Sequence, residues 1–191
     1  MKSRTIYIFI ILSLLHLKFF GQVSVSGIIL SGVNQQPLND VSIRINLSGA
    51  ATDENGAFFF EYKPKPKDSL VKIEFAALGY ITVDFILDIT RQQQYNFKLT
   101  LAPYNGIDRN MALNDIKNGN VKILLSGGIA PVFYKADRRF SRKYKVQFIE
   151  FGCEAIAPES LTSYNSTVFD YLDKTYGKKW RKKIRKDVVG L

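Results

Sequence analysis

Residues 41–46 read Val-Ser-Ile-Arg-Ile-Asn, with an apolar side chain at every second position. This period of two is typical of a β-strand that buries one face. The same alternation recurs at 23–29, 71–75, 81–85 and 95–101, and the apolar run at 57–62 adds a further expected strand. No helical period separates these runs, so the sequence predicts an antiparallel seven-stranded Greek-key β-sandwich over residues 22–103.

Polar segments at 32–40, 53–56 and 63–67 mark the connections between the expected strands. Asn55-Gly56 is the clearest of these signals, because both residues adopt positive φ angles at low cost. We interpret this pair as the turn of a β-hairpin.

Four short motifs in this region match a known family. They are Val-Ser-Gly at 25–27, Gln-Pro-Leu at 36–38 ahead of Val-Ser-Ile at 41–43, Thr-Asp-Glu-Asn-Gly-Ala-Phe at 52–58, and Leu-Gly-Tyr at 78–80. On these residues the region resembles the carboxypeptidase regulatory-like (transthyretin-like) β-sandwich domain of exported Bacteroidota proteins. The resemblance implies a sandwich fold, and it implies no peptidase activity in the sandwich itself.

The beginning of the chain has the composition of a secretory signal peptide. Lys2 and Arg4 precede an apolar run at 6–15, and Gly21 stands ahead of Gln22. The run is too short to span a bilayer comfortably, so we expect a signal peptide over residues 1–21 and export of the rest. The alternative is a signal that stays uncleaved as an anchor.

Charge and histidine content limit the chemistry of the exported part. Residues 1–21 hold three of the 27 basic residues and none of the 17 acidic ones, so the remaining chain has a formal net charge of +7. They also hold the single histidine, His16. Without histidine, residues 22–191 have no Ser-His-Asp or Cys-His mechanism and no histidine-based zinc site, which excludes a classical metallocarboxypeptidase.

Beyond Pro103 the apolar period changes from that of strands to that of a small α+β domain, residues 104–191. We expect helices at 110–118 and 133–143, strands at 121–125 and 145–151, and a longer helix after Pro158, capped by Ser160 or Ser163. Apolar side chains recur every fourth residue to the end of the chain (Tyr164, Val168, Leu172, Tyr176, Trp180, Ile184, Val188). This stripe predicts a C-terminal helix, interrupted at Gly177, with one buried face.

Basic residues crowd the end of this expected helix. The candidate contact residues for a polyanion or partner are Lys174, Lys178, Lys179, Arg181, Lys182, Lys183, Arg185 and Lys186. Such a cluster can bind phosphates, anionic lipid or an acidic partner, or it can be only the solvated face of the helix. A second basic group (Lys135, Arg138, Arg139, Arg142, Lys143, Lys145) would enlarge the patch if the two helices shared a face.

Other chemical signals are weaker. We expect the lone Cys153 to be a small buried side chain. The Asp53-Glu54-Asn55 group fits turn chemistry better than a calcium loop, and Ser126-Gly127-Gly128 lacks the Gly-Lys-Ser/Thr of a phosphate loop. Acidic residues in the tail give no paired carboxylates, so no catalytic residue, metal site or cofactor is predicted.

Three functions remain as hypotheses. The first is an exported, non-catalytic interaction or scaffold protein of the cell envelope, periplasmic or outer-membrane associated. The second is a peripheral envelope protein that binds anionic lipid or glycan through its basic C-terminal helix. The third is a small hydrolase or thiol enzyme in the tail, carried by Cys153 or by a pair of acidic residues. Nucleic acid is not an expected partner, and no transmembrane span is expected after signal cleavage.

Overall fold

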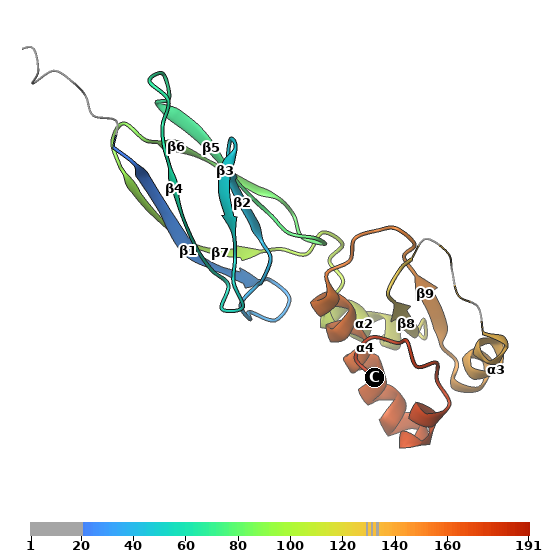
Figure 1. Ribbon diagram of the computed structural model, residues 1–191. Helices are drawn as coiled ribbons and strands as arrows, with labels where there is room; N and C mark the ends of the chain where they lie inside the picture. The colour runs from blue at the N-terminus through green and yellow to red at the C-terminus, as the bar shows by residue number, and fades with distance from the viewer. Residues whose placement is uncertain (1–20, 129, 131, 133) are drawn as a thin grey trace, which may run out of the picture.

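The computed structural model describes residues 21–128, 130, 132 and 134–191, so all of the expected signal peptide except Gly21 lies outside the described residues. Within these ranges the chain forms nine β-strands, three α-helices and one 3-10 helix. Figure 1 shows a strand-rich module followed by a second module that mixes helices with two short strands. The chain is therefore a β-rich α+β protein.

Two sheets make up the first module. A three-stranded sheet has the order β4-β1-β7, with β4 at Ala57–Tyr62, β1 at Val23–Ser31 and β7 at Gln94–Leu101. A four-stranded sheet has the order β3-β2-β5-β6, with β3 at Ser48–Ala51, β2 at Ser42–Ile45, β5 at Leu70–Ala76 and β6 at Val83–Asp88. Sequence reasoning did not predict β3, because Ser-Gly-Ala-Ala has no apolar alternation.

Both sheets contribute alternate side chains to one apolar core. Val25 and Ile29 of β1 are buried together with Ile43 of β2 and Ile73 of β5. Phe58 of one sheet meets Phe75 of the other edge to face, with ring centroids 5.9 Å apart. The alternation therefore predicted the buried face of these strands correctly, since side chains on a strand point to opposite faces in turn.

The expectation of an antiparallel arrangement throughout was wrong for one pair. β7 lies parallel to β1, with Ser24 opposite Gln94 and Ser31 opposite Leu101. The preceding strand, β6, belongs to the other sheet, so the connection to β7 crosses between sheets and β7 enters beside β1 in the same direction.

The turn at 53–56 exists, but it is not a hairpin. It joins β3 to β4, which belong to different sheets. The Asp53 carboxylate accepts hydrogen bonds from the backbone N–H groups of Asn55 and Ala57 at 2.8 and 2.9 Å, and Gly56 has φ +69°. The hairpin of this region lies at 46–47, between β2 and β3, where Asn46 has φ +52°.

The second module contains a parallel strand pair joined by a helix. β8 (Lys122–Leu125) and β9 (Gln147–Glu150) are parallel, and α3 (Lys135–Tyr144) connects them. Helix α2 (Arg109–Lys117) packs against the long helix α4 (Pro158–Tyr176). The expected strands and helices of this module are thus present, with ends shifted by a few residues.

Two expectations about the last helix were wrong. Neither Ser160 nor Ser163 caps α4, which instead begins with Pro158 in its first turn. The basic C-terminal helix does not exist either: α4 ends at Tyr176, Gly177 has φ +66°, and only a short 3-10 helix, η1 (Lys178–Lys182), follows. Val188 then pairs with Leu125 of β8 as an isolated antiparallel bridge.

The four-residue spacing of the apolar side chains explains why a continued C-terminal helix was predicted. Trp180, Ile184 and Val188 are buried as the pattern predicted. They belong to the core of the tail module but lie on a segment that folds back on α4. Within this segment, the Trp180 indole donates a hydrogen bond to Asp173 of α4 at 2.8 Å. Apolar residues at every fourth position indicate which side chains are buried. They do not show that the segment is a helix, because a segment that folds back can bury the same side chains.

The two modules contact each other around Gly79 and Tyr80. Gly79 of the first module packs so closely on the backbone of Ala157 that any side-chain carbon at position 79 would collide with the Ala157 nitrogen. The Tyr80 hydroxyl contacts the Ser31 hydroxyl at 2.7 Å and donates to the Glu159 carboxylate of α4 at 3.1 Å. Ala157 itself belongs to the core of the first module.

Candidate functional site

The eight predicted contact residues separate into two kinds. The six lysines are exposed on the last turn of α4, on η1 and on the segment after it (Lys174, Lys178, Lys179, Lys182, Lys183, Lys186). Arg181 and Arg185 are partly buried and form ion pairs. Both arginines are thus paired within the protein, and the six lysines have exposed side chains.

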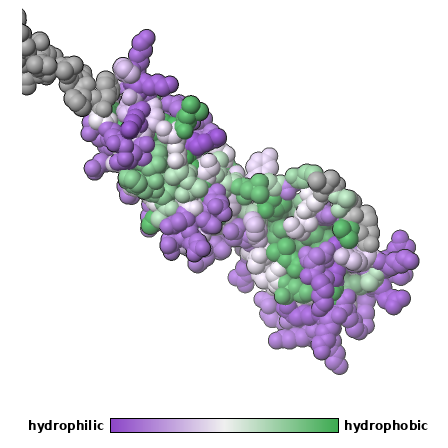
Figure 2. Space-filling view, in the orientation of Figure 1, coloured by the Kyte–Doolittle hydropathy of each residue, from purple (hydrophilic) through white to green (hydrophobic). Residues whose placement is uncertain are grey.

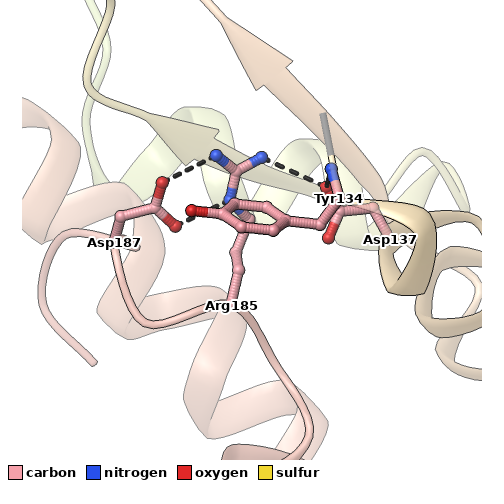
Figure 3. A network of polar contacts seen from close by, with 4 residues as sticks. All are labelled: Tyr134, Asp137, Arg185 and Asp187. Carbon is pink, nitrogen blue, oxygen red and sulfur yellow. Dashed lines mark hydrogen bonds and ion pairs between the residues drawn. The ribbon is translucent and has the colours of Figure 1, made fainter. Parts of the chain in front are cut away.

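Arg185 is the centre of a compact network, which Figure 3 shows from close by. Its guanidinium donates to both oxygens of Asp187 at 2.7 Å and to Asp137 on α3 at 3.2 Å. The Tyr134 ring covers the guanidinium, with 4.7 Å from the guanidinium carbon to the ring centroid. Only 7% of the Arg185 side chain is exposed. The hydrogen bonds with Asp187 raise the pKa of Arg185 and lower the pKa of Asp187.

Arg181 forms a similar pair with Asp173. The Arg181 guanidinium donates to both carboxylate oxygens of Asp173, at 3.1 to 3.3 Å, and lies over the Trp180 ring at 5.0 Å. These hydrogen bonds, with a smaller contribution from the Trp180 indole, lower the pKa of Asp173. Arg181 therefore stabilises the turn that ends α4.

A basic pocket lies between α3 and the segment after η1. The pocket has a volume of about 400 Å³, and its described lining residues are Ala136, Arg139, Phe140, Lys143, Tyr144 and Lys183. Lys183 comes from the predicted cluster, whereas Arg139 and Lys143 come from the second basic group. The structure thus joins two groups that are 40 or more residues apart in the sequence.

Contacts on both sides of this basic pocket hold it together. The Arg185–Asp137 ion pair ties the C-terminal segment to the first turn of α3. The Phe140 ring lies 6.4 Å from the Trp180 ring, and the Tyr144 ring meets the Tyr176 ring edge to face at 5.3 Å. The three cations are therefore presented by a packed aromatic support.

The chemistry of the basic pocket suits an anion. Three cationic side chains surround it, and its described lining residues include no carboxylate. Arg139 and Lys143 lie one helical turn apart on α3, so both project to the same side. Figure 2 shows that this end of the molecule is strongly hydrophilic. The described lining side chains can bind a negatively charged group, but they include no nucleophile paired with a general base.

Cys153 is exposed, so the expectation of a small buried side chain was wrong. It lies on the loop after β9, where the chain turns towards α4. The neighbouring Gly152 approaches the Ser126-Gly127-Gly128 loop so closely that a side-chain carbon at Gly127 would collide with the Gly152 carbonyl. Close backbone approach thus explains Gly127 without any phosphate.

Sequence reasoning missed two polar clusters in the tail module. The Tyr164 hydroxyl donates to Asp115 at 2.6 Å, and Lys122 pairs with the same carboxylate at 3.1 Å; burial raises the pKa of Tyr164. The fully buried Asn165 bonds to the N–H and C=O of Leu124 and to the C=O of Val189. The available signal in the sequence was Tyr164, whose hydroxyl lies in the apolar stripe and needs a hydrogen-bond partner when it is buried.

Neither metal binding nor membrane spanning has support in the described ranges. No group of three or more His, Cys, Asp or Glu side chains there could hold a metal ion. Likewise, none of the helices in that part of the chain combines the length and apolar character that crossing a membrane requires.

Comparisons with known proteins identify no family. No family model matches the chain, and no curated protein does. Among solved structures, a 3-chlorocatechol 1,2-dioxygenase from Rhodococcus opacus matches with 14% identity and a TM-score of 0.32, over 43% of this chain and 60% of that one. A 9R-lipoxygenase from Cyanothece matches with 21% identity and a TM-score of 0.34, over 48% of this chain and 18% of that one. The matches cover less than two thirds of either enzyme, and likeness this low supports no functional argument.

Proposed function

We propose that the protein is an exported, non-catalytic interaction protein of the cell envelope whose tail module binds an anionic partner in the basic pocket. The first module would be its scaffold, a seven-stranded Greek-key sandwich of the carboxypeptidase regulatory-like type. The motifs at 25–27, 36–38, 52–58 and 78–80 and the two sheets around one core support this assignment. The signal-like residues 1–21 support export, to the periplasm or the outer membrane.

The observation that carries the proposal is the meeting of Lys183 with Arg139 and Lys143 around one pocket. Basic side chains that only keep a surface soluble tend to lie apart from one another, because like charges repel. Here three of them share a concave site, and the C-terminal segment is fastened to α3 by the Arg185 network. A preformed site of this kind lowers the cost of binding an anion.

An acidic protein segment fits this basic pocket better than a membrane surface does. The two aromatic side chains of the pocket, Phe140 and Tyr144, are each 5% exposed, so they cannot insert into a bilayer. A ligand would instead place an extended, negatively charged group in the pocket, against the three cationic side chains. We therefore expect a partner protein that places Asp or Glu side chains against the three cations.

Anionic lipid or glycan is the second candidate. The observation in its favour is the set of exposed lysines on α4, η1 and the segment after it (Lys174, Lys178, Lys179, Lys182, Lys186). Long-range attraction to a polyanionic surface needs only such charges and falls with salt.

The test is a pull-down from envelope extract with the mature protein, residues 22–191, at low and high salt. The variant Lys143→Glu/Lys183→Glu reverses two charges in the basic pocket, and Lys63→Glu/Lys67→Glu makes the same charge change on an exposed loop of the first module. We expect a protein partner whose retention is weaker at high salt, because salt screens the ion pairs, and which is lost only with the pocket variant. Retention that both variants weaken equally, or retention of lipid or glycan at low salt only, would contradict the pocket proposal.

A further inference from the structure

A second cavity lies where the two modules meet, and it shares no lining residue with the basic pocket. It has a volume of about 200 Å³ and is lined by Gly79, Tyr80, Tyr104, Asn105, Glu154 and Ala155. The first four residues belong to the first module and the start of the connection, and the last two precede α4. We call it the junction cavity. Small-molecule sites occur preferentially at such domain interfaces.

The walls of the junction cavity are held by backbone contacts. The Tyr104 N–H donates to the Gly79 carbonyl at 2.9 Å, and Tyr80 forms an isolated bridge with Pro103. On the other side, the tight approach of Gly79 to Ala157 fixes the chain that leads from Glu154 into α4. Backbone contacts therefore fix the positions from which the Tyr80 and Tyr104 side chains extend.

Its two tyrosines are placed differently. The Tyr80 side chain is buried, and its hydroxyl is used by Ser31 and Glu159. Tyr104, by contrast, is 73% exposed. Figure 2 shows hydrophobic surface in the same region, between the two modules. An exposed ring beside a cavity provides a face on which a ligand can stack.

The charge of the junction cavity is opposite to that of the protein as a whole. Its described lining residues include the Glu154 carboxylate and no cation, and Glu159 lies directly behind Tyr80. None of the ion pairs among the described residues uses either glutamate. Among the described lining residues of the junction cavity, an exposed tyrosine ring thus stands together with a carboxylate that forms no ion pair.

We propose that the junction cavity binds an organic ammonium cation, with the Tyr104 ring and the Glu154 carboxylate as its main contacts. The ring face carries partial negative charge and attracts a cation, and a nearby carboxylate adds direct attraction. The Asn105 side chain can accept a hydrogen bond from a hydroxyl or amine next to the charge. The same chemistry can come from a small quaternary amine or from a lysine side chain of a partner.

The experiment is an NMR titration of the ¹⁵N-labelled mature protein with choline. Its matched control is 3,3-dimethylbutan-1-ol, which has the shape of choline without the charge. We expect choline to give saturable shifts of the Gly79, Tyr104 and Asn105 amides, and the neutral analogue to give none. Tyr104→Leu and Glu154→Gln should each weaken binding by about threefold to tenfold. Tyr104→Phe, which keeps the ring, and Glu54→Gln, on the distant turn, should bind as the parent does.

A third ligand, N-acetyl-lysine methylamide, distinguishes the two sources of the cation. Tighter binding of the lysine derivative assigns the junction cavity to a partner's side chain, and tighter binding of choline assigns it to a small amine. Equal shifts with the neutral analogue, or no saturable shift with either cation, would overturn the proposal. Saturable shifts with glucose but not with choline would overturn it in favour of a neutral sugar.

Discussion

Arg185 reaches across 48 residues of sequence to Asp137, and the 3.2 Å contact between their side chains attaches the C-terminal segment to the first turn of α3. The same Asp137 oxygen accepts the backbone N–H of Tyr134 at 3.3 Å, so one carboxylate serves both the helix start and the distant arginine. The basic pocket depends on this attachment, because Lys183 stands two residues before Arg185.

Replacing Arg185 with Ala is expected to lower the free energy of unfolding by about 2–4 kcal/mol. The change leaves Asp137 and Asp187 without their main partner and removes the cation under the Tyr134 ring. Urea unfolding followed by the fluorescence of Trp180 measures this, since Trp180 is the single tryptophan and is buried. Lys186→Ala, an exposed neighbour, should change the value by less than about 0.5 kcal/mol. Equal effects of the two changes would contradict a structural role for Arg185.

Acid should unfold the tail module partly through Asp173. The pKa of this carboxyl is lowered in the folded state, so its contribution is present above its unfolded-state pKa and is lost as the pH falls through the folded-state value. Asp173→Asn should therefore reduce the loss of stability below about pH 4. The measurement is urea unfolding at a series of pH values. Asp170→Asn, an exposed position on the same helix, is the matched control for the charge change.

Tyr80 should make stability depend on pH at the alkaline end. Burial raises the pKa of Tyr80 to about 12, so between pH 10 and 12 the unfolded chain ionises this phenol and the folded protein does not. Stability is then full below about pH 10 and falls as the pH rises through this window. In Tyr80→Phe this component disappears, and the loss of the hydroxyl bonded to Ser31 costs about 1–2 kcal/mol at neutral pH. An unchanged alkaline dependence in Tyr80→Phe would assign the effect to other tyrosines.

Gly56 should tolerate no side chain. It has φ +69°, and a side-chain carbon there would collide with the Ile29 carbonyl of β1. We expect Gly56→Ala to destabilise the protein by about 3 kcal/mol or more. Gly106 is the matched control: its φ is +61°, but no atom lies within 4 Å of a carbon added there, so Gly106→Ala should cost only the backbone term of about 1 kcal/mol. Thermal melts of both variants test the difference.

Cys153 should react with a thiol reagent in the folded protein, because its side chain is exposed. Titration with dithionitrobenzoate is expected to release one equivalent of thiolate before any denaturant is added. A thiol that reacts only after unfolding would show that the loop after β9 shields it. Cys153→Ser provides the zero-thiol baseline.

Several features were predictable from the sequence because they depend on local periodicity. The two-residue alternation located β1, β2, β5 and β7 and the faces that they bury, and the apolar run at 57–62 located β4. Small residues gave no such signal for β3, and alternation does not encode direction, so the parallel pairing of β7 with β1 was missed. The basic cluster can be read from the sequence, but the ion pairs of Arg181 and Arg185 depend on tertiary contacts that the sequence does not show.

By itself, the sequence determined most of the strands, the helices up to α4 and the burial of Trp180, Ile184 and Val188, because these features depend on the spacing of apolar residues along the chain. Only the tertiary structure decided that α4 ends at Tyr176 and that Arg185 turns inward to Asp137. It also decided that Lys183 joins Arg139 and Lys143. These outcomes depend on contacts between residues far apart in sequence, and a four-residue spacing is compatible with both a continued helix and a segment that folds back.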